Sequence, residues 1–398
     1  MKIAVSIMLI TVAGFLSVST AVRAEMLALV NYETKAEDSI KALRTQSGPA
    51  ARREGLAVVD VDPGSATLGK WLLDIPLPAD LVGHHLYYNR DFSKVYLTAL
   101  GRSELTVIDL TRKPWRVTAV PVPQCKVLED MVFSADKKTW WLTCMGSANI
   151  IVGDAVSDKP RSAIALPKPY PHGIALHEGI DRILVTSSLS PEFTDLQETI
   201  TAIEASTGRV LATYKVSKKP SPARVTPEEI FFMPGSNPPV AFVINDTGGT
   251  KSTGSIWAAL WSPEKQDFEV REMFDFAATE DAICTTMLFN RAADQLYVTT
   301  VVPGSLHVFD IAVDPLSLTL RQTIPTAPGA HHLALSKDQR YAVVQNSMVN
   351  LPGMNDGSIS VIDLVKQEVV AGVDTFKNQG LVHNSILLLP QWHQPMGM

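Results

Sequence analysis

The sequence predicts an all-β fold, a seven-bladed β-propeller with N- and C-terminal strands closing one blade. Three observations carry this prediction. A segment similar to "HHLYYNRDFSKVYLTAL" recurs along the chain, its copies are spaced like propeller blades, and helical periodicity is nearly absent. The strands are short, rich in β-branched and aromatic residues, and separated by turns, as in four-stranded blades.

Each repeat opens on two polar residues, followed by an apolar strand, a polar turn and a second apolar strand. Successive repeats start 43 to 57 residues apart, close to the ~40 to 50 residues of one blade. The longer spacings coincide with "SPEFTDLQET" and "GTKSTGS", which are interpreted as inserted loops. The seven repeats start at His84, Glu129, His172, Glu228, Thr285, His331 and His383.

The last repeat has one strand and then ends. Its missing strands are available near the N-terminus, in "MLALVNYE" and "GLAVVDVD". Joining both ends in one blade would close the ring and remove the exposed sheet edges. We expect a single domain over residues 25–398, with the charged segment "TKAEDSIKALRTQSGPAARRE" as a loop between the two N-terminal strands.

Residues 1–24 are expected to be a signal peptide. Lys2 precedes the apolar run "IAVSIMLITVAGFLSV", and Val22 and Ala24 precede a plausible cleavage site. The run is shorter than the ~20 residues that span a bilayer, so a retained anchor is the less favoured alternative. The mature chain is then periplasmic or secreted, with no membrane span.

The charge and the cysteines narrow the function. A formal net charge of −6 without a basic cluster argues against nucleic acid and favours small molecules or ions as partners. Cys125 and Cys144 flank one predicted hairpin and could form a disulfide after export, or remain free. Cys284 is left over, as a core residue or a redox group.

The histidines are the main functional signal. The first strand of each blade lines the central channel, so the two opening residues of all repeats form a ring. The second positions are His85, Asp130, Gly173, Glu229, Thr286, His332 and Asn384, and six of the nine histidines fall in these two sets. Strand alternation requires only one residue of each pair to face inward, although both can do so near a strand end.

Converging imidazoles predict a metal site. The expected ligands are His84, His85, His172, His331, His332 and His383. Imidazoles suit zinc, copper, iron and nickel, and export without a cysteine cluster favours copper, with zinc as the alternative. Glu129, Asp130 and Glu228 are expected to orient imidazoles or to move protons in catalysis. For His172 alone, a hydrogen bond to backbone or water is the competing interpretation.

The stretch "GLAVVDVDPGSATLGKWLLDIPLPADLVGHHLYYN" resembles the opening of selenium-binding proteins, also known as methanethiol oxidases. There, a Val-Asp-Val-Asp-Pro segment, a Gly-Lys step and a Leu-Pro-x-Pro segment lead to a His-His pair. "PEEIFFMPGSNPPVAFV" and "LVHN" are similar to later segments of that family. The resemblance implies a propeller that binds copper through channel histidines, here His84, His85 and His383, and oxidises methanethiol with oxygen to formaldehyde, hydrogen sulfide and hydrogen peroxide.

The chain also departs from that family. "LYYNRDFSK" replaces its Cys-x-x-Cys, and "EDMVFSAD" replaces its His-Thr-Ser-His. His331 and His332 stand where the family has Gln and an apolar residue. The family-like fold therefore carries a rearranged site, and the substrate is open.

Three functions fit the sequence. The first is a copper oxidase of a small thiol, and the second is a non-catalytic propeller that binds a metal or a protein partner. The third is a lactonase-like propeller that uses calcium or magnesium. Those ions require an oxygen-rich channel, and this function is ranked last because histidines dominate the channel positions. Turnover by a bound redox metal separates the first two.

Overall fold

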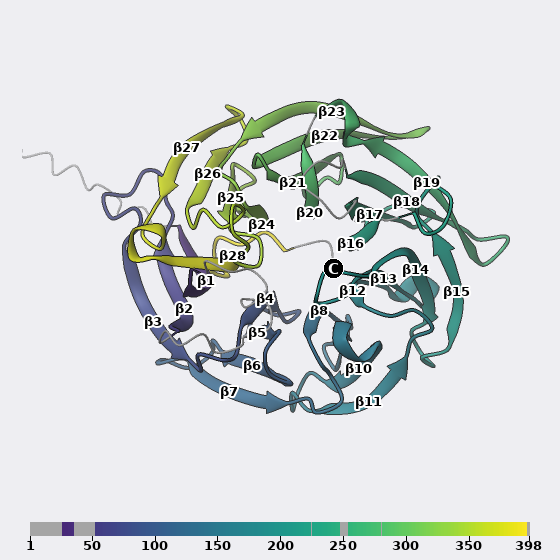
Figure 1. The fold of residues 1–398 in the computed structure, drawn as a ribbon, viewed down its shortest axis with the longest axis horizontal. Coiled ribbons are helices and arrows are strands. Elements are labelled where there is room, and N and C mark those ends of the chain that lie inside the picture. The colour runs from purple at the N-terminus through teal and green to yellow at the C-terminus, as the bar shows by residue number, and fades with distance from the viewer. Residues whose placement is uncertain (1–25, 36–51, 224, 247–253, 280, 396–398) are drawn as a thin grey trace, which may run out of the picture.

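A computed structural model describes residues 26–35, 52–223, 225–246, 254–279 and 281–395. Seven four-stranded antiparallel sheets stand around a central axis, and each is one blade (Figure 1). Short 3-10 helices are the only helices in the described part of the chain. The predicted seven-bladed β-propeller is confirmed. The expected signal peptide and most of the charged segment after the first strand lie outside the described residues.

Each sheet runs in order from its innermost to its outermost strand. The first three complete blades contain β4 (Gly83–Tyr88), β5 (Lys94–Ala99), β6 (Glu104–Asp109), β7 (Arg116–Pro121); β8 (Leu128–Phe133), β9 (Thr139–Cys144), β10 (Asn149–Asp154), β11 (Pro160–Ala165); and β12 (Pro171–His177), β13 (Arg182–Leu189), β14 (Leu196–Glu204), β15 (Val210–Lys215).

The next three blades contain β16 (Thr226–Phe232), β17 (Val240–Asp246), β18 (Ser255–Ser262), β19 (Asp267–Asp275); β20 (Ala282–Phe289), β21 (Gln295–Val302), β22 (Ser305–Val313), β23 (Leu316–Pro325); and β24 (Ala330–Leu335), β25 (Tyr341–Asn346), β26 (Ile359–Asp363), β27 (Glu368–Val373). The 3-10 helices are η1 (Met145–Ser147), η2 (Glu178–Ile180), η3 (Phe276–Ala278) and η4 (Lys377–Gln379).

The seventh blade joins the two ends of the chain, as the sequence predicts. Its strands are β28 (Leu381–Leu388), β1 (Leu27–Thr34), β2 (Glu54–Asp60) and β3 (Trp71–Leu77). β28 pairs antiparallel with β1, with Leu387 opposite Leu29 and Val382 opposite Glu33. This pairing closes the ring, because the edge strand that an open propeller would expose is covered.

The core lies between neighbouring blades, where the middle strands are buried on both faces. Trp140 on β9 is fully buried and packs in one cluster with Tyr96 of the preceding blade and Phe133. Its indole lies against the backbone of Gly153 on β10, where a Cβ would fall 1.9 Å from the ring. Only glycine fits there. The outermost strands, such as β7, are largely exposed.

Every innermost strand contains a register shift at the residues that open its repeat. In β4, Gly83 faces Ala99 and Leu86 faces Leu97, so His84 and His85 together oppose Thr98. The same shift occurs in β8, β12, β16, β20, β24 and β28. A β-bulge places two residues where regular pairing has one and re-aims their side chains. The sevenfold bulge thus lets both residues of a pair approach the channel.

The C-terminal segment is anchored up to residue 395. The Gln394 amide donates to the Leu335 carbonyl, and His393 forms an isolated bridge with Ser336. The His393 ring is buried against Tyr88. No helix in the described part of the chain is long and apolar enough to cross a membrane.

Candidate metal centre

Five histidines from three blades converge in the channel. His84 and His85 come from β4, His172 from β12, and His331 and His332 from β24. The rings of His84 and His85 are stacked with centroids 3.7 Å apart, and those of His331 and His332 with centroids 4.0 Å apart. The His85 ring meets His332 edge-on at 4.4 Å. The bulges therefore gather five of the six predicted ligands.

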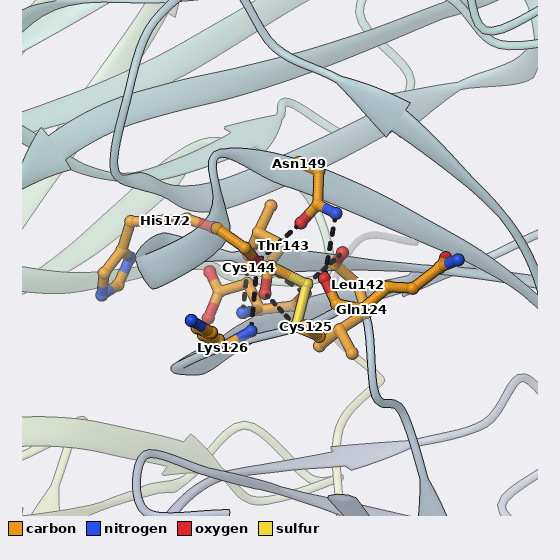
Figure 2. Close-up of a disulfide and its surroundings, with 10 residues drawn as sticks. Gln124, Cys125, Lys126, Leu142, Thr143, Cys144, Asn149 and His172 are labelled. Carbon is orange, nitrogen blue, oxygen red and sulfur yellow. Dashed lines mark hydrogen bonds between the residues drawn. A yellow bond between two sulfur atoms is a disulfide. The ribbon is translucent and has the colours of Figure 1, made fainter. Parts of the chain in front are cut away.

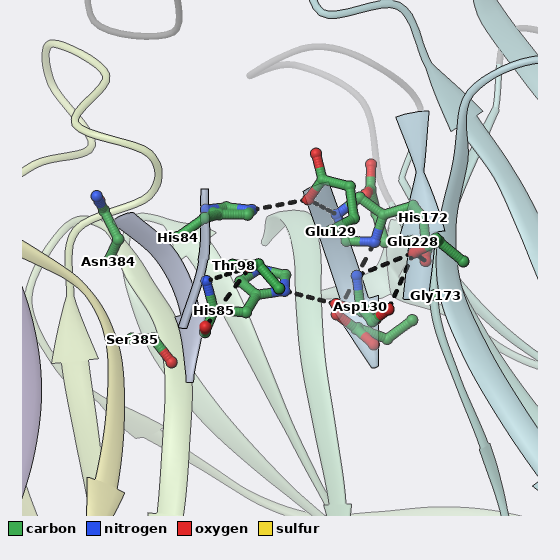
Figure 3. Close-up of polar contacts among 12 residues, drawn as sticks. His84, His85, Thr98, Glu129, Asp130, His172, Gly173, Glu228, Asn384 and Ser385 are labelled. Carbon is green, nitrogen blue, oxygen red and sulfur yellow. Dashed lines mark hydrogen bonds and ion pairs between the residues drawn. The ribbon is translucent and has the colours of Figure 1, made fainter. Parts of the chain in front are cut away.

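Carboxylates from the blades of β8 and β16 complete one side of this cluster (Figure 3). His84 Nε2 lies 3.0 Å from Glu129 Oε2, and His172 Nε2 lies 3.6 Å from the same oxygen. His172 Nε2 is also 3.5 Å from Glu228 Oε2. Two imidazole nitrogens thus share one carboxylate oxygen, which is a close approach of three potential ligand atoms.

A carboxylate holds the Nδ1 side of the His85 ring. Its Nδ1 lies 2.5 Å from Asp130 Oδ1, and the Tyr87 hydroxyl is 3.0 Å from the same nitrogen. The Tyr87 hydroxyl donates to Asp130 as well. The other nitrogen of His85, Nε2, has no hydrogen-bond partner among the described residues. Metal-binding histidines are characteristically oriented in this way, with a carboxylate on one nitrogen and the ion on the other.

Several other ring nitrogens of the cluster are buried without a hydrogen-bond partner in the described structure. These atoms are His84 Nδ1, His172 Nδ1, His331 Nδ1 and His332 Nδ1. A buried polar atom without a partner is costly, and native proteins rarely keep several together. The donor chemistry of this cluster therefore fits a metal ion.

Three overlapping sets of donors have ligand atoms within 4.8 Å of one another: His84, His85, Glu129 and His172; His85, His331 and His332; and His85, Asp130 and Glu229. His85 belongs to all three. The channel therefore contains a possible histidine and acidic metal-binding cluster, centred on His85.

Burial favours the neutral forms of several groups in this cluster. Burial, helped by His172, lowers the pKa of His84 to about 3, and burial lowers the pKa of His85 and His331 well below the usual range. Burial raises the pKa of Glu129 to about 8 and the pKa of Glu228 well above its usual range. Neutral imidazole is the form that binds metals. A cation in the channel would favour the ionised carboxylates.

A cavity of about 240 Å³ opens directly over the cluster. Its polar lining comes largely from the first residues of the repeats, among them His84, Glu129, His172, Glu228 and His331. Its other walls are mainly apolar and include Leu100, Val127, Met145, Leu189, Ile283, Met348 and Met354. Asp130, His85 and His332 do not line it. The cavity thus offers a small apolar molecule access to one layer of the donor cluster.

Sequence reasoning missed the threonines that hold the bulges. Thr143 Oγ1 on β9 accepts a hydrogen bond of 2.9 Å from the backbone N–H of Asp130. It also donates a hydrogen bond of 2.6 Å to the backbone carbonyl of His172 in the next blade. Thr186 and Thr299 donate in the same way to the Glu228 and His331 carbonyls, at 2.7 and 2.5 Å. The signal was present, because "VYLT", "WWLT", "ILVT" and "LYVT" occur in the second strands of four repeats, β5, β9, β13 and β21.

Two predicted groups lie apart from the donor sets. His383 Nδ1 is 3.2 Å from Gln345 Oε1, and its ring packs edge-on against Phe376. His383 occupies one of the fourteen ring positions, but its side chain belongs to none of the three donor sets. Cys284 is a buried free cysteine, and burial raises the pKa of its thiol well above the usual range, so it is not a thiolate.

Cys125 and Cys144 form a disulfide (Figure 2). It ties the segment before β8 to the end of β9. Both cysteines are fully buried. Val127 and Met145, which line the cavity, lie next to the bridge in the chain, and Thr143 is adjacent to Cys144. The bridge therefore fixes the hairpin that carries Glu129 and Asp130.

The solved structures that resemble this chain share its propeller. A hypothetical selenium-binding protein from Sulfolobus tokodaii superposes with a TM-score of 0.71 at 12% identity, over 93% of this chain and 94% of that one. A putative 6-phosphogluconolactonase from Bacteroides uniformis gives 0.61 at 11% identity, over 92% and 100%. A protein of unknown function from Desulfotomaculum acetoxidans gives 0.62 at 17% identity, over 91% and 98%.

These likenesses show the fold alone. No protein-family model and no curated protein matches the chain. At such identities, neighbours with different functions share one architecture, so function has to be argued from the site.

Proposed function

We propose that this protein is an exported, copper-dependent oxidase of a small thiol such as methanethiol. One observation carries the proposal: five histidines and Glu129 cluster at an apolar cavity, and His84, His172, His331 and Glu129 line it. The similarity in fold to a hypothetical selenium-binding protein supports the proposal. The buried disulfide supports export, because disulfides persist in oxidising compartments.

Copper and its alternative, zinc, fit the donors better than calcium or magnesium does. An imidazole-rich set suits copper and zinc, whereas calcium and magnesium prefer six or more oxygen ligands. This disfavours a lactonase-like site. His84, His85, His172, His331 and His332 would hold the ion, with Glu129 between His84 and His172. Copper bound there would supply redox chemistry between a thiolate and oxygen.

The protein's own residues bind the substrate and move its proton. The apolar walls would take the alkyl group and exclude water, which places the sulfur over His84 and His331. Glu228 lines the cavity beside His172 and would accept the thiol proton. Asp130 does not line the cavity, and its contact with His85 Nδ1 makes it a positioning residue. In the overall reaction, methanethiol, oxygen and water give formaldehyde, hydrogen sulfide and hydrogen peroxide, with oxygen taking two electrons from the carbon.

The test is metal content and turnover of residues 25–398, expressed through a periplasm without a histidine tag. We expect bound copper by mass spectrometry, and oxygen uptake with sulfide release on adding methanethiol. A His84→Asn, His331→Asn double variant should lose both, whereas His177→Asn, at the C-terminal end of β12, should keep both. Copper without turnover of any thiol would favour the non-catalytic metal-binding propeller. Absence of any transition metal after reconstitution would exclude the oxidase.

A further inference from the structure

The donors of the channel divide into two complete sets. One consists of His84, Glu129 and His172, and the other of His85, His331 and His332. His85 belongs to both clusters by distance, but the first still has three donors when His85 is assigned to the second. No side chain has to be shared, and three protein ligands are enough to hold a catalytic metal ion with an open position.

The first set has the spacing of ligands around one ion. His84 Nε2 and His172 Nε2 lie 3.0 and 3.6 Å from Glu129 Oε2. Ligand atoms about 2.0–2.1 Å from a tetrahedral ion are roughly 3.3 Å from one another. All three residues line the cavity, so this set faces the substrate.

The second set is oriented from behind. Asp130 and the Tyr87 hydroxyl occupy His85 Nδ1, and His85 Nε2 has no hydrogen-bond partner in the described structure. The rings of His85 and His332 pack edge to face with centroids 4.4 Å apart, and the His332 ring stacks on the His331 ring. His331 Nδ1 and His332 Nδ1 also have no hydrogen-bond partner there. Unsatisfied nitrogens on three neighbouring rings indicate a cation position separate from the first.

The sets are adjacent, because His84 and His85 stack with ring centroids 3.7 Å apart. Two-metal centres in proteins have ions about 3.5–4 Å apart. The composition of the channel is compatible with cations, because the carboxyl groups of Glu129, Asp130, Glu228 and Glu229 are buried and no Lys or Arg occupies any of the fourteen ring positions.

We propose that the channel holds two metal ions per chain, one on His84, Glu129 and His172 facing the cavity, and one on His85, His331 and His332. This inference rests on the proposed function for the existence of a metal site and adds its nuclearity. An ion on the first set would be the one that a substrate reaches more directly, since only His331 of the second set lines the cavity, and the neighbouring second ion would be close enough to supply electrons.

The experiment is a titration of the metal-free chain with Zn²⁺ in competition with a chromophoric chelator. The wild type should bind two equivalents. His84→Asn and His332→Asn should each bind one, and the double variant none. His177→Asn should still bind two, because His177 belongs to none of the donor sets. Thermal melts of the metal-free variants check that each one folds.

A second measurement uses Cu²⁺ and electron paramagnetic resonance. Two neighbouring Cu²⁺ ions in the wild type should couple and broaden or lose the signal of an isolated ion, whereas His332→Asn should restore that signal. One equivalent in the wild type, lost in either variant, would overturn the two-ion inference and leave the proposed metal site intact. Two equivalents retained by His332→Asn would also overturn it. No binding at all would overturn the proposed function as well.

Discussion

His85 Nδ1 lies 2.5 Å from Asp130 Oδ1, across the boundary between two blades, while His85 Nε2 has no hydrogen-bond partner in the described structure. The pair fixes which nitrogen of His85 is available. Since His85 is common to all three donor sets, the orientation of one ring affects the whole cluster.

We therefore expect Asp130→Asn to weaken metal binding by about 10–100-fold, the usual cost of losing an outer partner of a metal ligand. A competition titration measures this effect. Tyr87→Phe removes the longer contact with Nδ1 and the hydrogen bond to Asp130 but leaves the carboxylate in place, so it should cost less. Equal affinity of Asp130→Asn and wild type would show that the carboxylate does not position His85.

The threonines of the second strands offer a test of how the bulges are held. Thr143→Val removes the contacts with the Asp130 amide and the His172 carbonyl and leaves both groups buried. We expect a loss of about 1–3 kcal/mol in unfolding free energy and weaker metal binding. Thr201→Val is the matched control, because Thr201 Oγ1 is buried without a hydrogen-bond partner in the described structure. Denaturant unfolding should find that variant unchanged or slightly more stable.

The disulfide should stabilise both the fold and the site. Cys125 and Cys144 close a loop across 19 residues, and replacing both with alanine should cost about 2–4 kcal/mol. Because the bridge fixes the hairpin of Glu129 and Asp130, metal affinity should fall together with stability. Unchanged affinity in a folded double variant would confine the bridge to a purely structural role. Cys284→Ala leaves the bridge intact and controls for the loss of a thiol.

The repeat frame of the sequence predicts much of this architecture. All seven repeat starts fall within innermost strands, and the closure between β28 and β1 follows from a single strand at the C-terminal end and from N-terminal strands that lack an innermost strand of their own. The bulges could not be predicted, because they are a property of pairing between strands. Alternation alone would have sent one residue of each pair away from the channel.

The position of His383 shows the same limit. The frame treats it as equivalent to His84, but its ring turns to Gln345 and Phe376. Its neighbours on β25 and η4 come from parts of the chain that the frame does not relate to the channel. Residue type and spacing identify the ring positions, whereas packing of the surrounding side chains decides which rings reach the donor sets.

The pH dependence of stability can be assigned at Glu54, which lies away from the donor sets. Burial and the neighbouring Glu33 raise the pKa of Glu54 to about 7, against the opposing effect of Arg52. Between pH 4.5 and 7 the unfolded chain releases this proton while the folded chain keeps it. Stability contributed by Glu54 therefore falls as pH rises through that window, by up to about 3 kcal/mol.

Glu54→Gln should remove that part of the profile. The buried histidines, whose pKa values are lowered, act in the opposite direction, since stability rises as pH rises toward their unfolded value. The difference between the unfolding free energies of variant and wild type at pH 5 and pH 8 isolates Glu54. No change in that difference would show that Glu54 ionises normally in the folded chain.

The cavity can be separated from the metal centre by filling it. Leu189 lies at the end of β13 and lines the apolar wall without contributing a donor. Leu189→Trp should obstruct the space over His84 and raise KM for a thiol by at least about tenfold, because the substrate loses the apolar contacts that position it. Bound metal should be unchanged, since the donor sets lie beneath the cavity.

Val156→Trp is the control, because Val156 is 72% exposed on the outer side of its blade. If Leu189→Trp lost metal along with activity, the wall and the donors would be one structural unit. If neither metal nor KM changed, the thiol would have to reach the histidines by another route.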